Sequence, residues 1–211
     1  MSDYPWKRFW RPRGKVILLT DGGYLADPDI GGPYCNPYLV PFETIAEERC
    51  LVLLGEPGIG KSTTLATRVL ETQQRCCAEV RCLRFDLRAY NSEQWLHRAL
   101  FEHPEIARWQ GDSSILHLFL DSLDESLLRI DTVTDMIAEE MERWPRQRLF
   151  LRIACRTADW RPSLEEQLRH FWGQDAVGVF ELAPLRRIDV RVAAQAEVRD
   201  PEAFLREVDP V

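Results

Sequence analysis

The chain has 211 residues, 45% of them hydrophobic, and a formal net charge of −7. This length suits one α/β domain of generous size or one domain with appendages, and the apolar content is that of a protein with a buried core. The acidic balance argues against a nucleic-acid partner, and no stretch approaches the roughly 20 apolar residues of a membrane span.

Residues 1–41 form an N-terminal arm whose first fifteen residues are basic and aromatic. Five Lys or Arg residues there outnumber the single acid, Asp3, and are interleaved with Trp6, Phe9 and Trp10. Such a segment suits packing on the domain or on a neighbour; the alternative is a surface for nucleic acid or a membrane. Because the arm lacks the apolar core of a signal peptide, we expect a cytoplasmic protein.

The rest of the arm predicts one short strand and a loop. Lys15–Thr20 is apolar and β-branched enough for a strand, and Asp21–Gly23 is a turn signal that ends it. From Asp27 to Pro41 the chain is rich in Gly and Pro, which predicts a loop.

From residue 42 to residue 183, short apolar strands alternate with helix-forming stretches. This alternation predicts an α/β fold with a parallel sheet of about five strands and helices on both faces. Further helical patterns over 184–211 predict the start of a small helical domain. The expected strands are Cys50–Leu54, Val80–Leu87, Leu116–Asp121, Leu149–Cys155 and Val177–Leu182; the expected helices are Lys61–Gln74, Ser92–Phe101, Thr132–Trp144, Ser163–Phe171, Ile188–Ala196 and Pro201–Val208.

A complete phosphate-binding loop, G-x-x-x-x-G-K-[ST], lies between the first of these strands and its helix. In such a loop the backbone N–H groups point at phosphate oxygens, at the positive end of a helix dipole. Lys61 is placed to reach the β- and γ-phosphates, and the Ser62 hydroxyl to ligate Mg²⁺. The predicted nucleotide-binding residues are Gly55, Glu56, Pro57, Gly58, Ile59, Gly60, Lys61, Ser62 and Thr63.

A second acidic motif follows the strand Leu116–Asp121. A buried strand that ends in a carboxylate delivers it to the phosphate edge of the sheet, so Asp121 is the expected metal partner of Ser62. Asp124 and Glu125 follow closely enough to orient or deprotonate an attacking water, and we predict catalytic roles for both. The alternative is a polar turn that caps the next helix.

Two arginines belong to the strand Leu149–Cys155 or follow it. Arg156, at the strand end, suits a sensor that contacts the γ-phosphate; the alternative is a salt bridge to an acid near Asp124. Arg152 lies inside a strand expected to be buried, which requires either a partly open face or an acidic partner. The six cysteines show no zinc-ligand spacing, and we expect Cys50 and Cys155 to act as small hydrophobic residues.

Together, the loop Gly55–Ser62, the motif Leu120–Glu125 and the strand end Cys155–Arg156 resemble a NACHT-type NTPase of the STAND class of signalling ATPases. The run Leu182–Leu185 is similar to that family's exit into a helical domain. The likeness covers roughly Phe42 to Val211, and its more specific mark is the acidic pair after Ser122, since many P-loop ATPases place a Glu directly after the metal Asp.

The resemblance implies a switch rather than a metabolic enzyme. Such proteins hold ADP in a closed state, exchange it for ATP on sensing a ligand, and form homo-oligomers that activate an effector; bacterial members often serve in antiviral defence. The chain stops at Val211, where further helical and winged-helix parts are expected, so we expect a truncated product or the core of a larger protein.

Three functions stay open on the sequence alone. The first is an ATP-binding signalling core with slow Mg²⁺-dependent hydrolysis; ATP is favoured over GTP because no guanine-reading Asn/Thr-Lys-x-Asp run occurs. The second is a small-molecule kinase, for which the arginines at 152, 156 and 161 would act as a lid. The third is a nucleotide-stabilised interaction module that does not hydrolyse.

Overall fold

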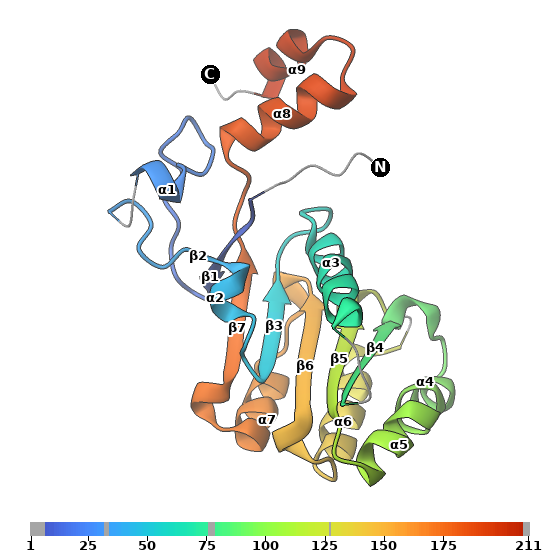
Figure 1. Ribbon diagram of the computed structural model, residues 1–211. Helices are drawn as coiled ribbons and strands as arrows, with labels where there is room; N and C mark the ends of the chain where they lie inside the picture. The colour runs from blue at the N-terminus through green and yellow to red at the C-terminus, as the bar shows by residue number, and fades with distance from the viewer. Residues whose placement is uncertain (1–6, 32–33, 76–78, 127, 209–211) are drawn as a thin grey trace. The chain divides into compact units, whose positions relative to one another are not determined.

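The computed structural model describes residues 7–31, 34–75, 79–126 and 128–208. The chain forms two compact units: one comprises Ala46–Phe180, and the other combines the residues before Ala46 with those after Phe180 (Figure 1). The sequence instead separated the N-terminal arm from the C-terminal helices. They share a unit because Phe9, near one end, hydrogen-bonds Ala183, near the other.

The unit Ala46–Phe180 is built on strands in the order β7-β3-β6-β5-β4. Parallel pairing in register joins β3 to β6, β6 to β5 and β5 to β4. β6 therefore separates β3 from β5, and their carboxyl ends lie along one edge. The bounds are β3 (Cys50–Leu54), β4 (Val80–Asp86), β5 (Ile115–Asp121), β6 (Leu149–Cys155) and β7 (Val177–Leu182), the last of which continues into the other unit.

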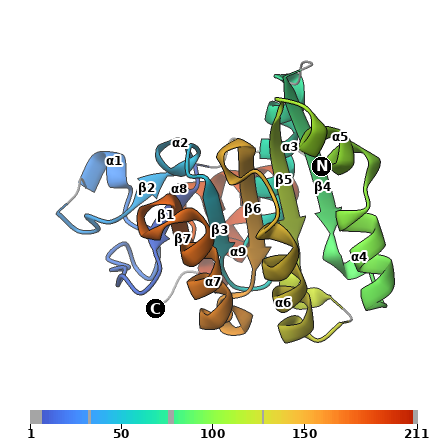
Figure 2. The same ribbon diagram turned by 90° about the horizontal axis from the view of Figure 1, so that it is seen from below.

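Helices cover both faces of this sheet, as the sequence predicted. Figure 2 shows α3 on one face and α6 and α7 on the opposite face. The connections between parallel strands place them there. The bounds are α3 (Lys61–Gln74), α4 (Glu93–Phe101), α5 (Pro104–Gly111), α6 (Ile130–Met141) and α7 (Pro162–Trp172).

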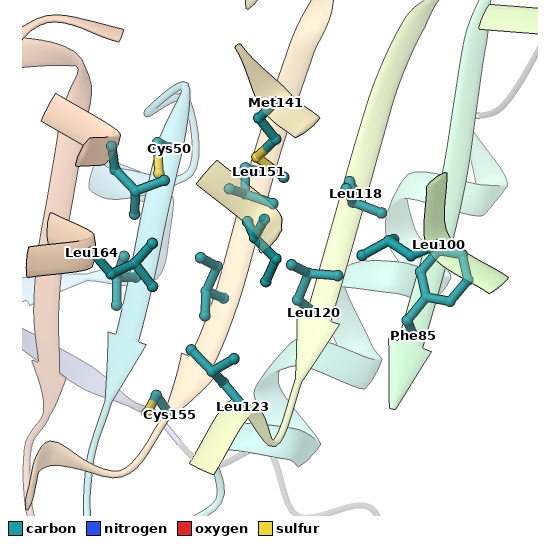
Figure 3. Packing of buried hydrophobic residues seen from close by; sticks show 14 of the residues in the cluster. Cys50, Phe85, Leu100, Leu118, Leu120, Leu123, Met141, Leu151, Cys155 and Leu164 are labelled. Atoms are coloured by element: carbon teal, nitrogen blue, oxygen red, sulfur yellow. The ribbon is translucent and has the colours of Figure 1, made fainter. Parts of the chain in front are cut away.

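The main core lies between the strands and the helices α4 to α7 (Figure 3). Because side chains alternate along a strand, every second residue of β3, β5 and β6 points into it, as Cys50, Leu118 and Leu151 do. Burying a leucine there contributes about 1.5–3 kcal/mol. Burial also raises the pKa of Cys50 to about 12. Both Cys50 and Cys155 are buried, as expected, whereas Cys76 and Cys77 lie outside the described residues.

Helix α5 was not predicted from the sequence. Pro104 marks a break after α4, but proline also suits the first position of a helix, where its missing N–H costs nothing. The His103 ring accepts the Glu105 N–H at 3.2 Å and caps this new start. Ile106 and Trp109 then anchor the helix in the core.

In the other unit the strand expected over Lys15–Thr20 is wrong. The strand is β1 (Phe9–Pro12), which pairs antiparallel with β2 (Val40–Pro41). Leu18 is 52% exposed, and its backbone N–H and C=O pair instead with the side-chain amide of Asn36. An apolar run without a neighbouring strand does not join a sheet.

The basic and aromatic arm packs within its own unit. Trp10 is fully buried and meets the Phe42 ring edge-on, with ring centroids 6.2 Å apart. Trp6 lies outside the described residues. The helices of this unit are α1 (Pro28–Gly31), α2 (Phe42–Ile45), α8 (Arg187–Glu197) and α9 (Pro201–Val208). Among the helices that the structure describes, none has the length and apolarity needed to cross a bilayer.

Candidate functional site

The loop between β3 and α3 depends on two glycines for its conformation. Gly58 and Gly60 have φ angles of 74° and 105°, in the left-handed region that side chains disfavour. The space beside both glycines is open, so it is the backbone conformation, not crowding, that requires glycine. Helix α3 begins directly at Lys61, which places its positive dipole end at the loop.

Lys61 is held across this loop by two main-chain carbonyls. Its Nζ donates to the oxygen of Gly55 at 2.6 Å and to that of Glu56 at 3.0 Å. Partial burial lowers the pKa of Lys61, and the nearby Asp124 carboxylate opposes this shift. The ammonium group is thus positioned by the loop itself, in the place where phosphate oxygens would meet it.

Ser62 and Asp121 converge as the sequence predicted. The Ser62 hydroxyl donates to Asp121 Oδ1 at 2.9 Å, and Asp121 is fully buried at the end of β5. Hydroxyl and carboxylate oxygens are the donors that a hard cation prefers, so this pair fits Mg²⁺. No cluster of three or more His, Cys, Asp or Glu metal donors occurs within the described ranges.

A cavity of about 170 Å³ opens beside this pair. Its wall combines residues of the phosphate loop and the first turn of α3 with residues at and just after the end of β5, and with one residue of β6: Pro57, Gly58, Gly60, Lys61, Ser62 and Thr63; Asp121, Ser122, Asp124 and Glu125; and Ala154. Pockets that enclose a whole drug-sized ligand measure roughly 300–1,000 Å³, so this volume suits the phosphates rather than the nucleoside.

A strained residue directs the second acidic pair. Ser122 is the one non-glycine residue with positive φ in the described part of the chain, at 58°. Its conformation turns the chain sharply out of β5 into a short 3-10 helix at Leu123–Glu125. The Asp124 side chain is almost buried, at 3% exposure, whereas that of Glu125 is 38% exposed.

Arg156 contacts both acids from the end of β6. Its backbone N–H donates to Asp124 Oδ1 at 2.8 Å, and its guanidinium forms an ion pair with Asp124 Oδ2 at 2.8 Å. The same guanidinium donates to Glu125 Oε1 at 3.1 Å. The hydrogen bond to Glu125 is the main cause that raises the pKa of Arg156. The salt bridge considered from the sequence is therefore present, and the sensor role stays a prediction.

Sequence reasoning missed two further arginines at the site, both carried by β4 or the turn that follows it. Arg84 forms an ion pair with Asp121 at 2.6 Å, and Arg88 lies 3.7 Å from Glu125 while also pairing with Asp86. The one available signal was an arginine two residues before the end of the strand Val80–Asp86.

The surroundings of Arg152 match neither of the two expectations from the sequence, a partly open face or an acidic partner. The residue is only 4% exposed, yet its guanidinium donates to main-chain carbonyls, that of Ala46 at 2.5 Å and that of Leu151 at 3.0 Å. Burial lowers the pKa of Arg152 to about 10. Main-chain carbonyl oxygens thus accept the hydrogen bonds of the buried guanidinium. The sequence does not predict this, because any residue type can provide a main-chain carbonyl.

The predicted fold class is confirmed: the chain has a mixed α/β, mostly parallel architecture of the P-loop NTPase type, with the loop at the carboxyl end of β3. No protein-family model and no curated protein matches the chain.

Solved structures with a similar arrangement include PCH-2 of C. elegans, with a TM-score of 0.48 and 16% identity, covering 80% of this chain and 44% of that one. The E. coli MS115-1 HORMA:CdnC:Trip13 complex gives 0.46 and 12%, covering 75% and 59%. EssC (ATPases 2 and 3) from Geobacillus thermodenitrificans gives 0.36 and 13%, covering 99% and 53%. The chain thus spans about half the length of these chains.

Proposed function

We propose that the chain binds Mg²⁺-ATP at the phosphate loop and hydrolyses it slowly, as the nucleotide-binding core of a NACHT-type signalling switch. The observation that carries the proposal is the convergence of Lys61, Ser62 and Asp121 on one small cavity at the start of α3. A bound Mg²⁺ would be held by Ser62 and Asp121 and would neutralise phosphate charge. ADP is the expected ligand of the resting state.

Slow turnover is favoured by the contacts of the acidic pair. Asp124 and Glu125, the residues expected to activate water, are both tied to Arg156. Both oxygens of Asp124 and one oxygen of Glu125 are already in contact with Arg156, which leaves fewer oxygens to orient a water. The same contacts favour, as a second candidate, a module that binds nucleotide without hydrolysing it.

The signalling role, oligomer formation and service in antiviral defence rest on the sequence resemblance. The site supports them only through nucleotide binding, the property that such a switch requires.

Purified protein should be titrated with ATP, ADP and GTP in Mg²⁺, with thermal unfolding and phosphate release followed together. We expect stabilisation by ATP and ADP, weaker stabilisation by GTP, and slow phosphate release. Lys61→Ala should remove the stabilisation, because the ammonium group and its phosphate contacts are lost. Lys15→Ala, at a lysine of the other unit that lies over the Tyr38 ring, is the matched control.

Unchanged ATP binding by Lys61→Ala would show that the site is assigned wrongly. Brisk turnover that begins only when small-molecule acceptors are added would identify a kinase instead.

A further inference from the structure

Asp121, the carboxylate expected to bind the metal, is already paired with a cation of the chain. Arg84 Nη2 donates to Asp121 Oδ2 at 2.6 Å. The other carboxylate oxygen, Oδ1, accepts the hydroxyls of Ser62 at 2.9 Å and of Ser122 at 3.4 Å. Both oxygens of this buried carboxylate therefore have protein donors.

The pairing of two parallel strands brings Arg84 to this point. In the register of β4 and β5, Arg84 lies opposite Phe119, and Asp86 lies opposite Asp121. Arg84 thus lies two residues before the end of β4. Its side chain extends toward the carboxyl end of the sheet, where it contacts the Asp121 carboxylate on β5. Arg88, in the turn that follows β4, forms ion pairs with Asp86 and Glu125, whereas Arg84 forms the ion pair with Asp121.

Charge and solvation explain what this pair does. A buried carboxylate without a partner has a large desolvation cost, so a cation beside it stabilises the fold. The same guanidinium repels a second cation that approaches the same oxygens. Free Mg²⁺ also gives up its water reluctantly, and Asp121 paired with Arg84 offers it little net negative charge.

We propose that Arg84 determines the specificity of the metal site. Its ion pair with Asp121 prevents free Mg²⁺ from binding to this carboxylate, so the metal binds only together with a nucleotide polyphosphate. This inference rests on the proposed nucleotide binding. The phosphates supply the negative charge that the Arg84–Asp121 pair lacks. The Arg84 side chain is 34% exposed and Asp121 is not, so Arg84 is the partner able to move without disturbing the core.

The test compares Mg²⁺ alone with Mg²⁺ plus ADP, by calorimetric titration and thermal unfolding of the wild type and of Arg84→Gln. In the wild type, Mg²⁺ alone should neither bind measurably nor raise the unfolding temperature, while Mg²⁺-ADP does both. In Arg84→Gln, binding of Mg²⁺ alone should become at least about tenfold tighter, which corresponds to about 1.4 kcal/mol. The metal-free variant should melt lower than the wild type, and Mg²⁺ should restore part of the loss.

Three variants separate charge from packing. Arg84→Lys keeps the positive charge and should exclude free Mg²⁺ as the wild type does. Adding Asp121→Asn to Arg84→Gln should abolish the gained binding. Arg81→Gln is the matched control, because Arg81 is on the same strand and also pairs with carboxylates, those of Glu105 and Asp112.

Equal binding of free Mg²⁺ by Arg84→Gln and the wild type would overturn the inference. If Arg84→Gln does not fold, the wild type still decides, because binding of Mg²⁺ alone as tight as with ADP would overturn it too. Failure of the wild type to bind any nucleotide would instead refute the proposed function. Nucleotide binding together with an unchanged response to free Mg²⁺ in Arg84→Gln refutes only the role of Arg84.

Discussion

The Ser62 hydroxyl donates to Asp121 Oδ1 across 2.9 Å, although 59 residues separate the two in the chain. The contact joins the first turn of α3 to the carboxyl end of β5. It exists because parallel strands bring their carboxyl ends to one edge of the sheet, where the phosphate loop also turns. Two oxygens that suit a hard cation thus meet beside the phosphate-sized cavity.

Ser62→Ala should weaken Mg²⁺-dependent ATP binding by about tenfold, or about 1.4 kcal/mol, because one of the two metal-ligand oxygens is lost. Binding measured in a chelator should change little. Calorimetric titration with and without Mg²⁺ checks this. Thr67→Ala is the control, since Thr67 is exposed on the same helix and its hydroxyl donates only to the Thr63 carbonyl. An unchanged magnesium dependence in Ser62→Ala would exclude the residue as a ligand.

Asp124→Ala should destabilise the fold by about 1–3 kcal/mol, because the Arg156 N–H loses its buried acceptor. Urea unfolding without nucleotide measures this directly. Asp175→Ala, at an exposed residue of the same unit, should leave the midpoint nearly unchanged. A stability equal to that of the wild type would mean that Asp124 contributes nothing structural.

Glu125→Gln should bind ATP as the wild type does and release phosphate about 10²-fold more slowly, the usual minimum for loss of a general base. Its side chain is 38% exposed, so stability should be nearly unchanged. Single-turnover phosphate release checks the rate, with Glu166→Gln on the exposed surface of α7 as control. Hydrolysis at the parental rate would show that Glu125 is not catalytic.

Arg156→Gln should reduce the preference for ATP over ADP by about tenfold, because a charged hydrogen bond to the γ-phosphate contributes about 1.5–3 kcal/mol. Competition titrations with the two nucleotides measure the ratio. Arg161→Gln removes a similar exposed arginine, which pairs with Asp131 at 3.3 Å, and should leave the ratio as it is. If both variants keep the wild-type ratio, Arg156 serves only as a structural ion-pair partner.

His117 should make the fold sensitive to mild acid. Its ring stacks on Phe150 of β6 at a centroid distance of 4.7 Å, and burial, reinforced by the charges of Arg152 and Arg49, lowers its pKa from 6.5 to about 4. Between pH 6.5 and about 4, His117 is protonated in the unfolded chain but stays neutral in the folded chain. Stability contributed by the neutral ring is therefore lost as the pH falls from 6.5 toward 4.

His117→Phe should keep the stack and flatten this part of the pH profile, measured by urea unfolding at several pH values. His170→Gln, at an exposed position of α7, is the control and should follow the wild type. A variant profile as steep as that of the wild type would place the titrating group elsewhere.

Elements whose signals are local were predicted well. The strands β3, β6 and β7 and the helix α3 begin and end at the predicted residues, because mostly apolar strand segments and the helix that follows the glycine-rich loop are marked within a short stretch of sequence. The failures came where a signal has two meanings. A proline such as Pro104 can end a helix, but here it begins α5, and Lys15–Thr20 has strand composition but joins no strand in the structure.

The site divides in the same way. The phosphate loop, Asp121 and the acids after Ser122 were found from the sequence, because glycines that need positive φ and a carboxylate at a strand end are properties of one short segment. Arg84 was missed because its role depends on which strand lies beside β5 and in which register.

By itself, therefore, the sequence determined the apolar strands, the phosphate-binding loop and the candidate metal ligands. Only the tertiary structure decided which cations neutralise which carboxylates: Arg84 on Asp121, and Arg156 on Asp124 and Glu125. The physical reason is one of range. Backbone conformation and apolar periodicity depend on a few residues that are neighbours in the sequence. An ion pair depends instead on the distance between strands that come together only when the chain folds.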